Sequence, residues 1–128
     1  MTTAALRARY LGDSVQTASP QRLLVMAYDR LALDLVRAEE ALRAGDTATG
    51  ADQLQHAQEI VFELLSSLRA DAWEGGPSLA ALYNWLISEL TAANVKQDAR
   101  RVADCRTVVE PLRDAWREAA ASLGSSPV

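Results

Sequence analysis

Four stretches of this chain carry apolar residues spaced alternately three and four positions apart. Because an α-helix has about 3.6 residues per turn, this spacing places the apolar side chains on one face of each helix. The four apolar faces consist of Leu24, Tyr28, Leu31, Leu35, Ala38 and Leu42; Leu54, Ala57, Val61, Leu64 and Leu68; Leu79, Leu82, Leu86, Leu90 and Ala93; and Val102, Cys105, Val109, Leu112, Trp116 and Ala119. Such a chain is predicted to be all-α, an antiparallel up-down-up-down four-helix bundle.

The residues between these stretches set the predicted boundaries. Ser19 and Pro20 supply an N-cap hydroxyl and a first-turn proline, and Gly45 with Asp46 separates the first two helices. Since 128 residues suffice for one core but not two, residues 1–123 are predicted to form a single domain. It comprises an irregular N-terminal segment 1–18 and helices over about 20–44, 47–70, 78–93 and 98–122, with loops at 74–77 and 94–97 and a disordered tail at 124–128.

Two residues are at odds with these helices. Gly50 costs roughly 1 kcal/mol relative to alanine in the first turn of the second helix, so fraying is expected there. Pro111 lies inside the fourth helix and cannot donate a backbone hydrogen bond to the Thr107 carbonyl. The sequence leaves open whether the fourth helix kinks or breaks at this proline.

Charge and hydropathy exclude several classes of function. Thirteen basic and seventeen acidic side chains give a net charge of −4, which disfavours nucleic-acid binding because the chain lacks the positive field that displaces counterions from phosphate. The longest uncharged stretch covers only residues 75–88, and the N-terminus has no apolar core of an export signal. We therefore expect neither an export signal nor membrane insertion.

The chain also offers little for catalysis or metal binding. Cys105, the only cysteine, lies on an apolar face and is expected to be buried, protonated and inert. His56, Glu59 and Glu63 could share a helix face, but a di-iron bundle needs two histidines and this chain has one. The three residues are predicted to form a solvated polar edge, and we expect no catalytic residue, no metal and no cofactor.

Several large apolar residues fall outside the four apolar faces. On an ideal helical wheel, Met26 and Leu33 lie nearly opposite the face of the first helix, Phe62 lies off the face of the second, and Trp85 and Ile87 flank the face of the third. Exposed apolar patches usually mark interaction sites. The five residues are candidate partner-binding residues, unless they are scattered surface residues or kinked and supercoiled helices turn them inward.

An ordered set of sequence segments resembles one known family. Tyr10, Asp13-Ser14-Val15 and Thr17-Ala18-Ser19-Pro20, followed by QRLLVMAYDR, resemble the N-terminal signature of the bacterial flagellar secretion chaperone FliS. The segments HAQEIVFELLSSL (56–68), LAALYNWLISEL (79–90) with Ala93-Asn94, and LRDAW (112–116) resemble the later helices of that family in order and spacing. The likeness covers about residues 10–116. Asp13 and Ala27 depart from it, standing where asparagine and leucine are common.

The resemblance implies a non-enzymatic cytoplasmic chaperone, a monomer or weak homodimer. Such a chaperone binds the C-terminal segment of flagellin, prevents its premature polymerisation and delivers it to the flagellar type III export apparatus. The resemblance also implies the export gate component FlhA as a second partner, and adds Tyr10, Val15 and Asn94 to the candidate binding residues. Tyr10 and Val15 could instead only cover the apolar end of the bundle. The alternatives in function are an adaptor bundle for other partners or a catalytic bundle with an unrecognised site.

Overall fold

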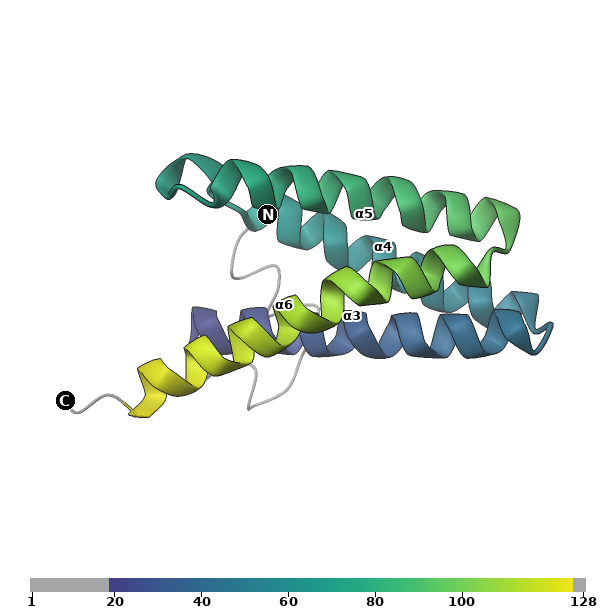
Figure 1. The fold of residues 1–128 in the computed structure, drawn as a ribbon, viewed down its shortest axis with the longest axis horizontal. Coiled ribbons are helices and arrows are strands. Elements are labelled where there is room, and N and C mark those ends of the chain that lie inside the picture. The colour runs from purple at the N-terminus through teal and green to yellow at the C-terminus, as the bar shows by residue number, and fades with distance from the viewer. Residues whose placement is uncertain (1–18, 126–128) are drawn as a thin grey trace.

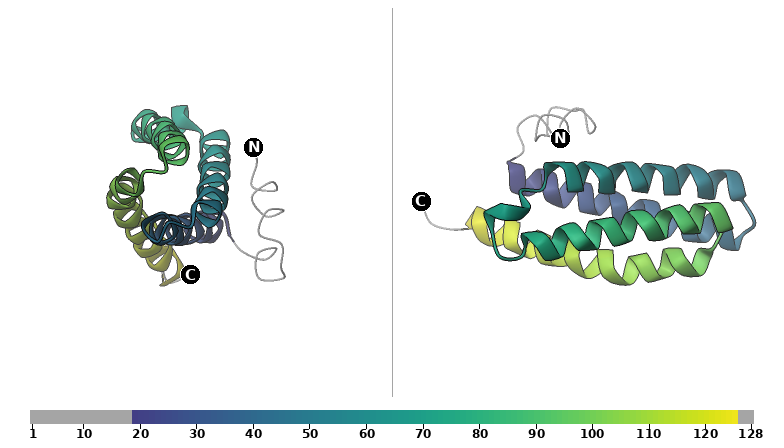
Figure 2. Two further views of the ribbon diagram at one scale, coloured as in Figure 1. Left: turned by 90° about the vertical axis from the view of Figure 1, so that its right-hand side faces the viewer. Right: turned by 90° about the horizontal axis from the view of Figure 1, so that it is seen from above.

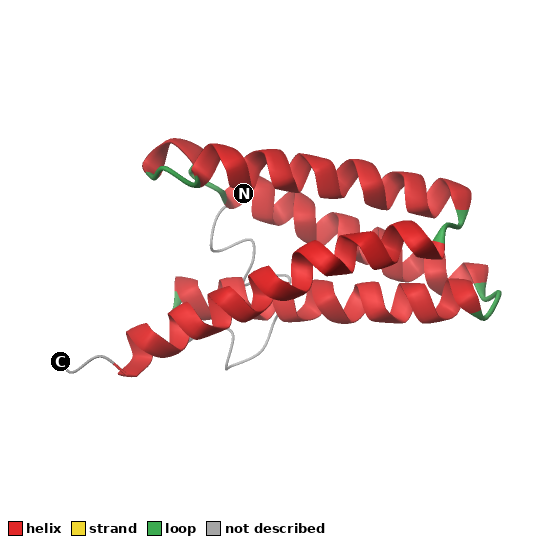
Figure 3. Cartoon of the chain, viewed as in Figure 1, coloured by secondary structure: helices red, strands yellow, loops and turns green. Residues whose placement is uncertain are grey.

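The structure, a computed structural model, describes residues 19–125 and consists of four long helices and one short one (Figures 1 and 3). The helices are α3 (Pro20–Arg43), α4 (Thr47–Ser67), the 3-10 helix η1 (Ala70–Ala72), α5 (Gly76–Lys96) and α6 (Ala99–Ser125). Consecutive long helices run antiparallel, which confirms the predicted bundle. Tyr10, Val15 and the rest of segment 1–18 lie outside the described residues, as do residues 126–128.

Local capping explains where α3 and α4 begin. The Ser19 hydroxyl accepts a hydrogen bond from the backbone N–H of Arg22 at 3.3 Å, and Pro20 is the first helical residue, as predicted. At the next turn Gly45 adopts a φ of +79°, which glycine tolerates at little cost, and the Asp46 carboxylate accepts from the Thr49 N–H at 3.1 Å. The turn between α3 and α4 is therefore specified by its own residues.

Gly50 has a packing role that helix propensity alone does not reveal. It is buried, and a Cβ at this position would lie 2.6 Å from Cδ2 of Leu42. The missing side chain lets Leu42 of α3 pack directly against the backbone of α4.

The predicted loops around α5 were too long. Gly76 and Pro77 belong to the first turn of α5, and Asn94 lies within the helix, which continues to Lys96. The turn that follows is tight because Gln97 takes a left-handed conformation, with a φ of 54°. The next residue, Asp98, accepts hydrogen bonds from the first N–H groups of α6.

α6 is continuous through Pro111, so the helix does not break at this proline. The proline ring lies on the exposed side of the helix. The predicted disordered tail began too early, because Gly124 and Ser125 belong to α6.

The buried core contains most of the predicted apolar faces, and the partly buried residues Leu24, Leu42, Leu68, Leu112 and Trp116 pack against it. Two positions show how neighbouring helices change the pattern. On α5 the core takes Tyr83, whereas Leu82 is only partly buried. On α6, Ala119 is exposed although it continues the apolar pattern. The reason is visible in Figure 1, where α6 diverges from α5 and runs along the start of α3, so that the last turns of α6 have no helix opposite them on the α5 side.

The helices follow one another around the bundle in the order α3, α4, α5, α6, with α6 closing the ring against α3 (Figure 2). Within residues 19–125, no helix combines the length and the apolar character that a membrane span requires.

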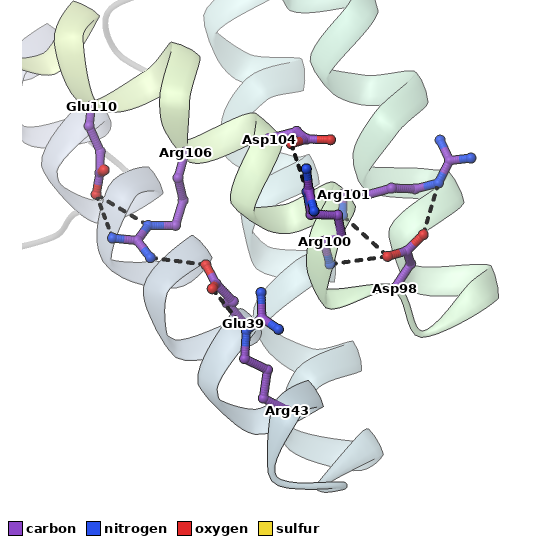
Figure 4. A network of polar contacts seen from close by, with 8 residues as sticks. All are labelled: Glu39, Arg43, Asp98, Arg100, Arg101, Asp104, Arg106 and Glu110. Atoms are coloured by element: carbon purple, nitrogen blue, oxygen red, sulfur yellow. Dashed lines mark hydrogen bonds and ion pairs between the residues drawn. The ribbon is translucent and has the colours of Figure 1, made fainter.

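Ion pairs join the helices at the end of the bundle where α5 turns into α6 (Figure 4). Arg106 of α6 contacts Glu39 of α3 at 2.9 Å and Glu110 at 3.1 Å, and Arg101 of α6 contacts Glu89 of α5 at 3.1 Å. Partial burial acts to raise the pKa of Glu39, but hydrogen bonds from Arg106 and Arg43 outweigh it and hold that pKa below its ordinary value. These pairs hold α6 against both α3 and α5 at this end, whereas towards the other end Arg117 pairs α6 with Asp29 of α3 alone among the described residues.

Candidate functional site

A polar cluster lies between α3 and α4. Asp34 is fully buried and accepts hydrogen bonds from Arg30 Nε at 3.0 Å and from Nδ1 of His56, which is half-buried. Glu63 is only 3% exposed. The prediction of a solvated edge is therefore wrong for Glu63, whereas Glu59 is exposed as predicted. Within residues 19–125, no three His, Cys, Asp or Glu side chains are placed together to hold a metal ion.

Cys105 is fully buried, as its position on the apolar face of α6 predicted. Burial, with smaller contributions from Glu89 and Asp104, raises the pKa of the thiol to about 12. The reactive thiolate is therefore scarce at neutral pH, and the residue acts as a small apolar core residue.

Three of the predicted off-face apolar residues are exposed. Leu33 and Trp85 are each 39% exposed and Phe62 is 52% exposed, whereas Met26 and Asn94 are half-buried. Leu33, Phe62 and Trp85 are exposed because each lies away from the apolar face of its helix.

Ile87, another of the candidate residues, is partly buried and packs against the core. Thr91, one turn later on α5, accepts a hydrogen bond from Gln58 of α4 at 2.8 Å, so this flank of α5 faces α4. The helical wheel of α5 alone could not show that α4 covers this flank.

The exposed residues lie on three helices and not in one patch. Trp85 lies one turn before Glu89, on the flank of α5 that faces α6, and Phe62 lies one turn after Gln58, on the flank of α4 that faces α5. Leu33 belongs to α3. A partner that contacts all three must extend over several helices.

A cavity lies at the end of the bundle where α5 and α6 diverge. Its volume is about 370 Å³, and every long helix contributes to its wall. The lining residues are Leu24, Leu64, Ser67, Leu68, Arg69, Trp73, Leu79, Tyr83 and Trp116. Most of this wall is apolar, so the cavity suits an apolar group of a partner.

Aromatic residues shape this cavity. Trp73 is 50% exposed, and its ring packs so closely on Gly75 that a Cβ there would lie 2.2 Å from it. The Trp116 ring contacts that of Tyr28, with centroids 6.3 Å apart. The Tyr28 hydroxyl in turn forms a 2.8 Å hydrogen bond with that of Tyr83. Burial raises the pKa of both tyrosines, so both hydroxyls stay protonated.

This cavity was not predicted from the sequence. Trp116 was predicted to belong to the core, and no role was predicted for Arg69, Trp73 or Tyr83. One signal was available, because Trp73 is a large apolar residue in a loop, beside the two glycines that let the loop fold tightly.

Comparison with known proteins decides the family. The family model described as flagellar protein FliS matches residues 2–123. The chain belongs to the FliS family of flagellar secretion chaperones. The resemblance drawn from the sequence segments is thereby confirmed, and with it the expectation of a non-enzymatic protein.

Individual FliS relatives agree with this assignment. The flagellar secretion chaperone FliS of Bacillus subtilis is 32% identical over 110 residues, which cover 86% of this chain and 82% of the relative. That of Salmonella typhimurium is 30% identical over 109 residues, covering 83% and 80%. A solved structure described as a flagellar chaperone from bacteria has the same fold, with a TM-score of 0.74 at 22% identity, over 93% of this chain and 98% of the other.

Proposed function

We propose that this FliS-family chain binds the C-terminal segment of flagellin in the cytoplasm, prevents its premature polymerisation and delivers it to the flagellar type III export apparatus. Family membership supports an export substrate as the partner. The observation that carries the proposal is the apolar cavity between the diverging helices, together with exposed Leu33, Phe62 and Trp85.

Burial of apolar surface is the proposed mechanism. A large apolar side chain contributes about 1.5–3 kcal/mol when it is fully buried, whereas a flexible client loses conformational entropy as it becomes ordered. Several separated contacts are therefore needed to offset the conformational entropy that the client loses. The cavity and three exposed apolar residues on different helices supply them for a client that folds along the bundle. One chaperone holds one client, with no cofactor.

Delivery requires a second contact, which we propose is with the export gate component FlhA. Tyr10 and Val15, from the N-terminal segment, are proposed to contact either the client or FlhA. This segment leads into Ser19 and Pro20, and Leu24 of the cavity follows within the first turns of α3. The N-terminal segment is thus joined to α3 only a few residues before Leu24, which lines the cavity.

Calorimetry tests the first step directly. The full-length chain is titrated with a peptide of about the last 40 residues of flagellin from the same organism, a length that gives a flexible client enough contacts to offset its ordering. We expect one peptide per chain with at least micromolar affinity, and a negative heat-capacity change because apolar surface is buried. Absence of binding heat at micromolar concentrations at two temperatures would contradict the proposal and favour an adaptor for other partners.

A further inference from the structure

We propose that the cavity holds an apolar side chain of the flagellin segment, and that Arg69 pairs with a carboxylate of the same segment that lies beside this side chain. The inference rests on the proposed function and adds to it the chemistry of one subsite.

The apolar part of the subsite follows from the walls of the cavity. Leu24, Leu64 and Leu79 line it from three helices, and Trp73 and Trp116 add aromatic surface. A volume of about 370 Å³ lies at the small end of the range of about 300–1,000 Å³ typical of ligand pockets. The cavity therefore suits one or two side chains of a peptide.

Arg69 supplies the charge. It is the only charged residue in the cavity wall, and it forms no ion pair within residues 19–125. Arg30, Arg101 and Arg106, by contrast, each contact a carboxylate. A guanidinium beside an apolar cavity matches a carboxylate in both charge and geometry.

The surroundings make this pairing selective. The chain as a whole carries a charge of −4, so its summed charge repels a carboxylate on the client. A carboxylate beside Arg69, which is exposed at the rim of the cavity, is attracted instead. Electrostatic complementarity of this kind fixes the register of a bound segment.

A charge reversal with a matched control tests the inference. Arg69→Glu and Arg100→Glu change the net charge equally, but Arg100 lies at the start of α6, and its side chain is 84% exposed. The flagellin peptide is expected to bind Arg69→Glu about tenfold more weakly than wild type, and to bind Arg100→Glu within about twofold of wild type. Thermal melts of both variants verify that the bundle remains folded.

The peptide provides the other half of a double-mutant cycle. Each acidic residue of the peptide is replaced in turn by its amide. One replacement is expected to weaken binding to wild type by several-fold and to have no further effect on Arg69→Glu. Such coupling identifies the carboxylate that pairs with Arg69.

The possible failures are distinguishable. If the wild-type chain does not bind the peptide at all, the proposed function is wrong and this inference falls with it. If the peptide binds wild type, but both charge reversals weaken binding equally, only the role of Arg69 is wrong. If Arg69→Glu alone weakens binding and no acidic residue of the peptide couples to it, the carboxylate pairing is wrong.

Discussion

Among the predicted client-binding residues that the structure describes, Phe62 on α4 is the most exposed, at 52%. We expect Phe62→Asp to weaken flagellin-peptide binding by roughly tenfold, because a contact worth about 1–2 kcal/mol is lost. The Tm is expected to change by less than about 2 °C, because an exposed side chain contributes little to folding. Calorimetric titration and thermal melts measure the two effects.

Ile60 is the matched control, two residues earlier on the same helix and fully buried. Ile60→Asp places a carboxylate in the core, and the Tm is expected to fall by roughly 10 °C or more. A comparable loss of Tm in Phe62→Asp would show that Phe62 belongs to the core and would remove it from the binding surface.

Between α3 and α6, Glu39 and Arg106 form a contact whose strength depends on pH. The folded protein holds the pKa of Glu39 below the value that the unfolded chain has. Its contribution to stability is therefore fully present above the unfolded pKa of about 4.5, and is lost as the pH falls through the folded pKa. Glu39→Gln is expected to reduce the free energy of unfolding near pH 7 and to have a much smaller effect near pH 3.

Urea denaturation at both pH values measures this difference. Arg100→Gln serves as the control, because it removes a pair with Asp104 in which both side chains are more than half exposed. An equal effect of Glu39→Gln at both pH values would show that the α3–α6 contact is not electrostatic.

The junction of η1 with α5 depends on one glycine. A Cβ on Gly76 would lie 2.0 Å from the carbonyl oxygen of Ala70, and backbone atoms cannot move aside as a side-chain end can. Gly76→Ala is expected to reduce the free energy of unfolding by about 1–3 kcal/mol, although alanine is the better helix former. Ser78→Ala, on the exposed side of the same turn, is expected to stay within about 0.5 kcal/mol of wild type.

For the whole molecule, client binding and stability are linked. A peptide that binds only the folded bundle stabilises it by about 2.7 kcal/mol at a concentration one hundred times its Kd. For a chain of 128 residues this corresponds to a rise in Tm of roughly 10 °C. A scrambled peptide of the same composition should leave the Tm unchanged. An unchanged Tm with the flagellin peptide would mean that the folded bundle is not its binding partner.

Apolar periodicity was enough to predict the four helices and most of the core, because burial of Leu54, Val61 or Leu90 depends only on which face of its helix turns inward. It could not separate Tyr83 from Leu82, since α5 is apolar around much of its circumference and only the neighbouring helices decide which side is covered.

The cavity could not be predicted from the sequence for a related reason. Its wall combines the beginnings of α3 and α5, the end of α4, the residues on both sides of η1 and the later turns of α6. Periodicity describes one helix at a time, whereas the cavity depends on the angle between α5 and α6. Exposed Phe62 and Trp85 could be predicted, but the subsite of Arg69 could not.

The hydrogen bond between Tyr28 and Tyr83 joins two helices that stand diagonally across the bundle, α3 and α5. A slip of one residue would shift α5 by about 1.5 Å, far more than a hydrogen bond tolerates. It would leave two buried hydroxyls without a hydrogen-bond partner, at a free-energy cost of about 1–3 kcal/mol each. The pair therefore fixes both the spacing and the register of the diagonal helices. Because Tyr83 also forms part of the cavity wall, the same hydrogen bond holds that part of the wall in place, and we expect the proposed client, not the bundle, to change conformation on binding.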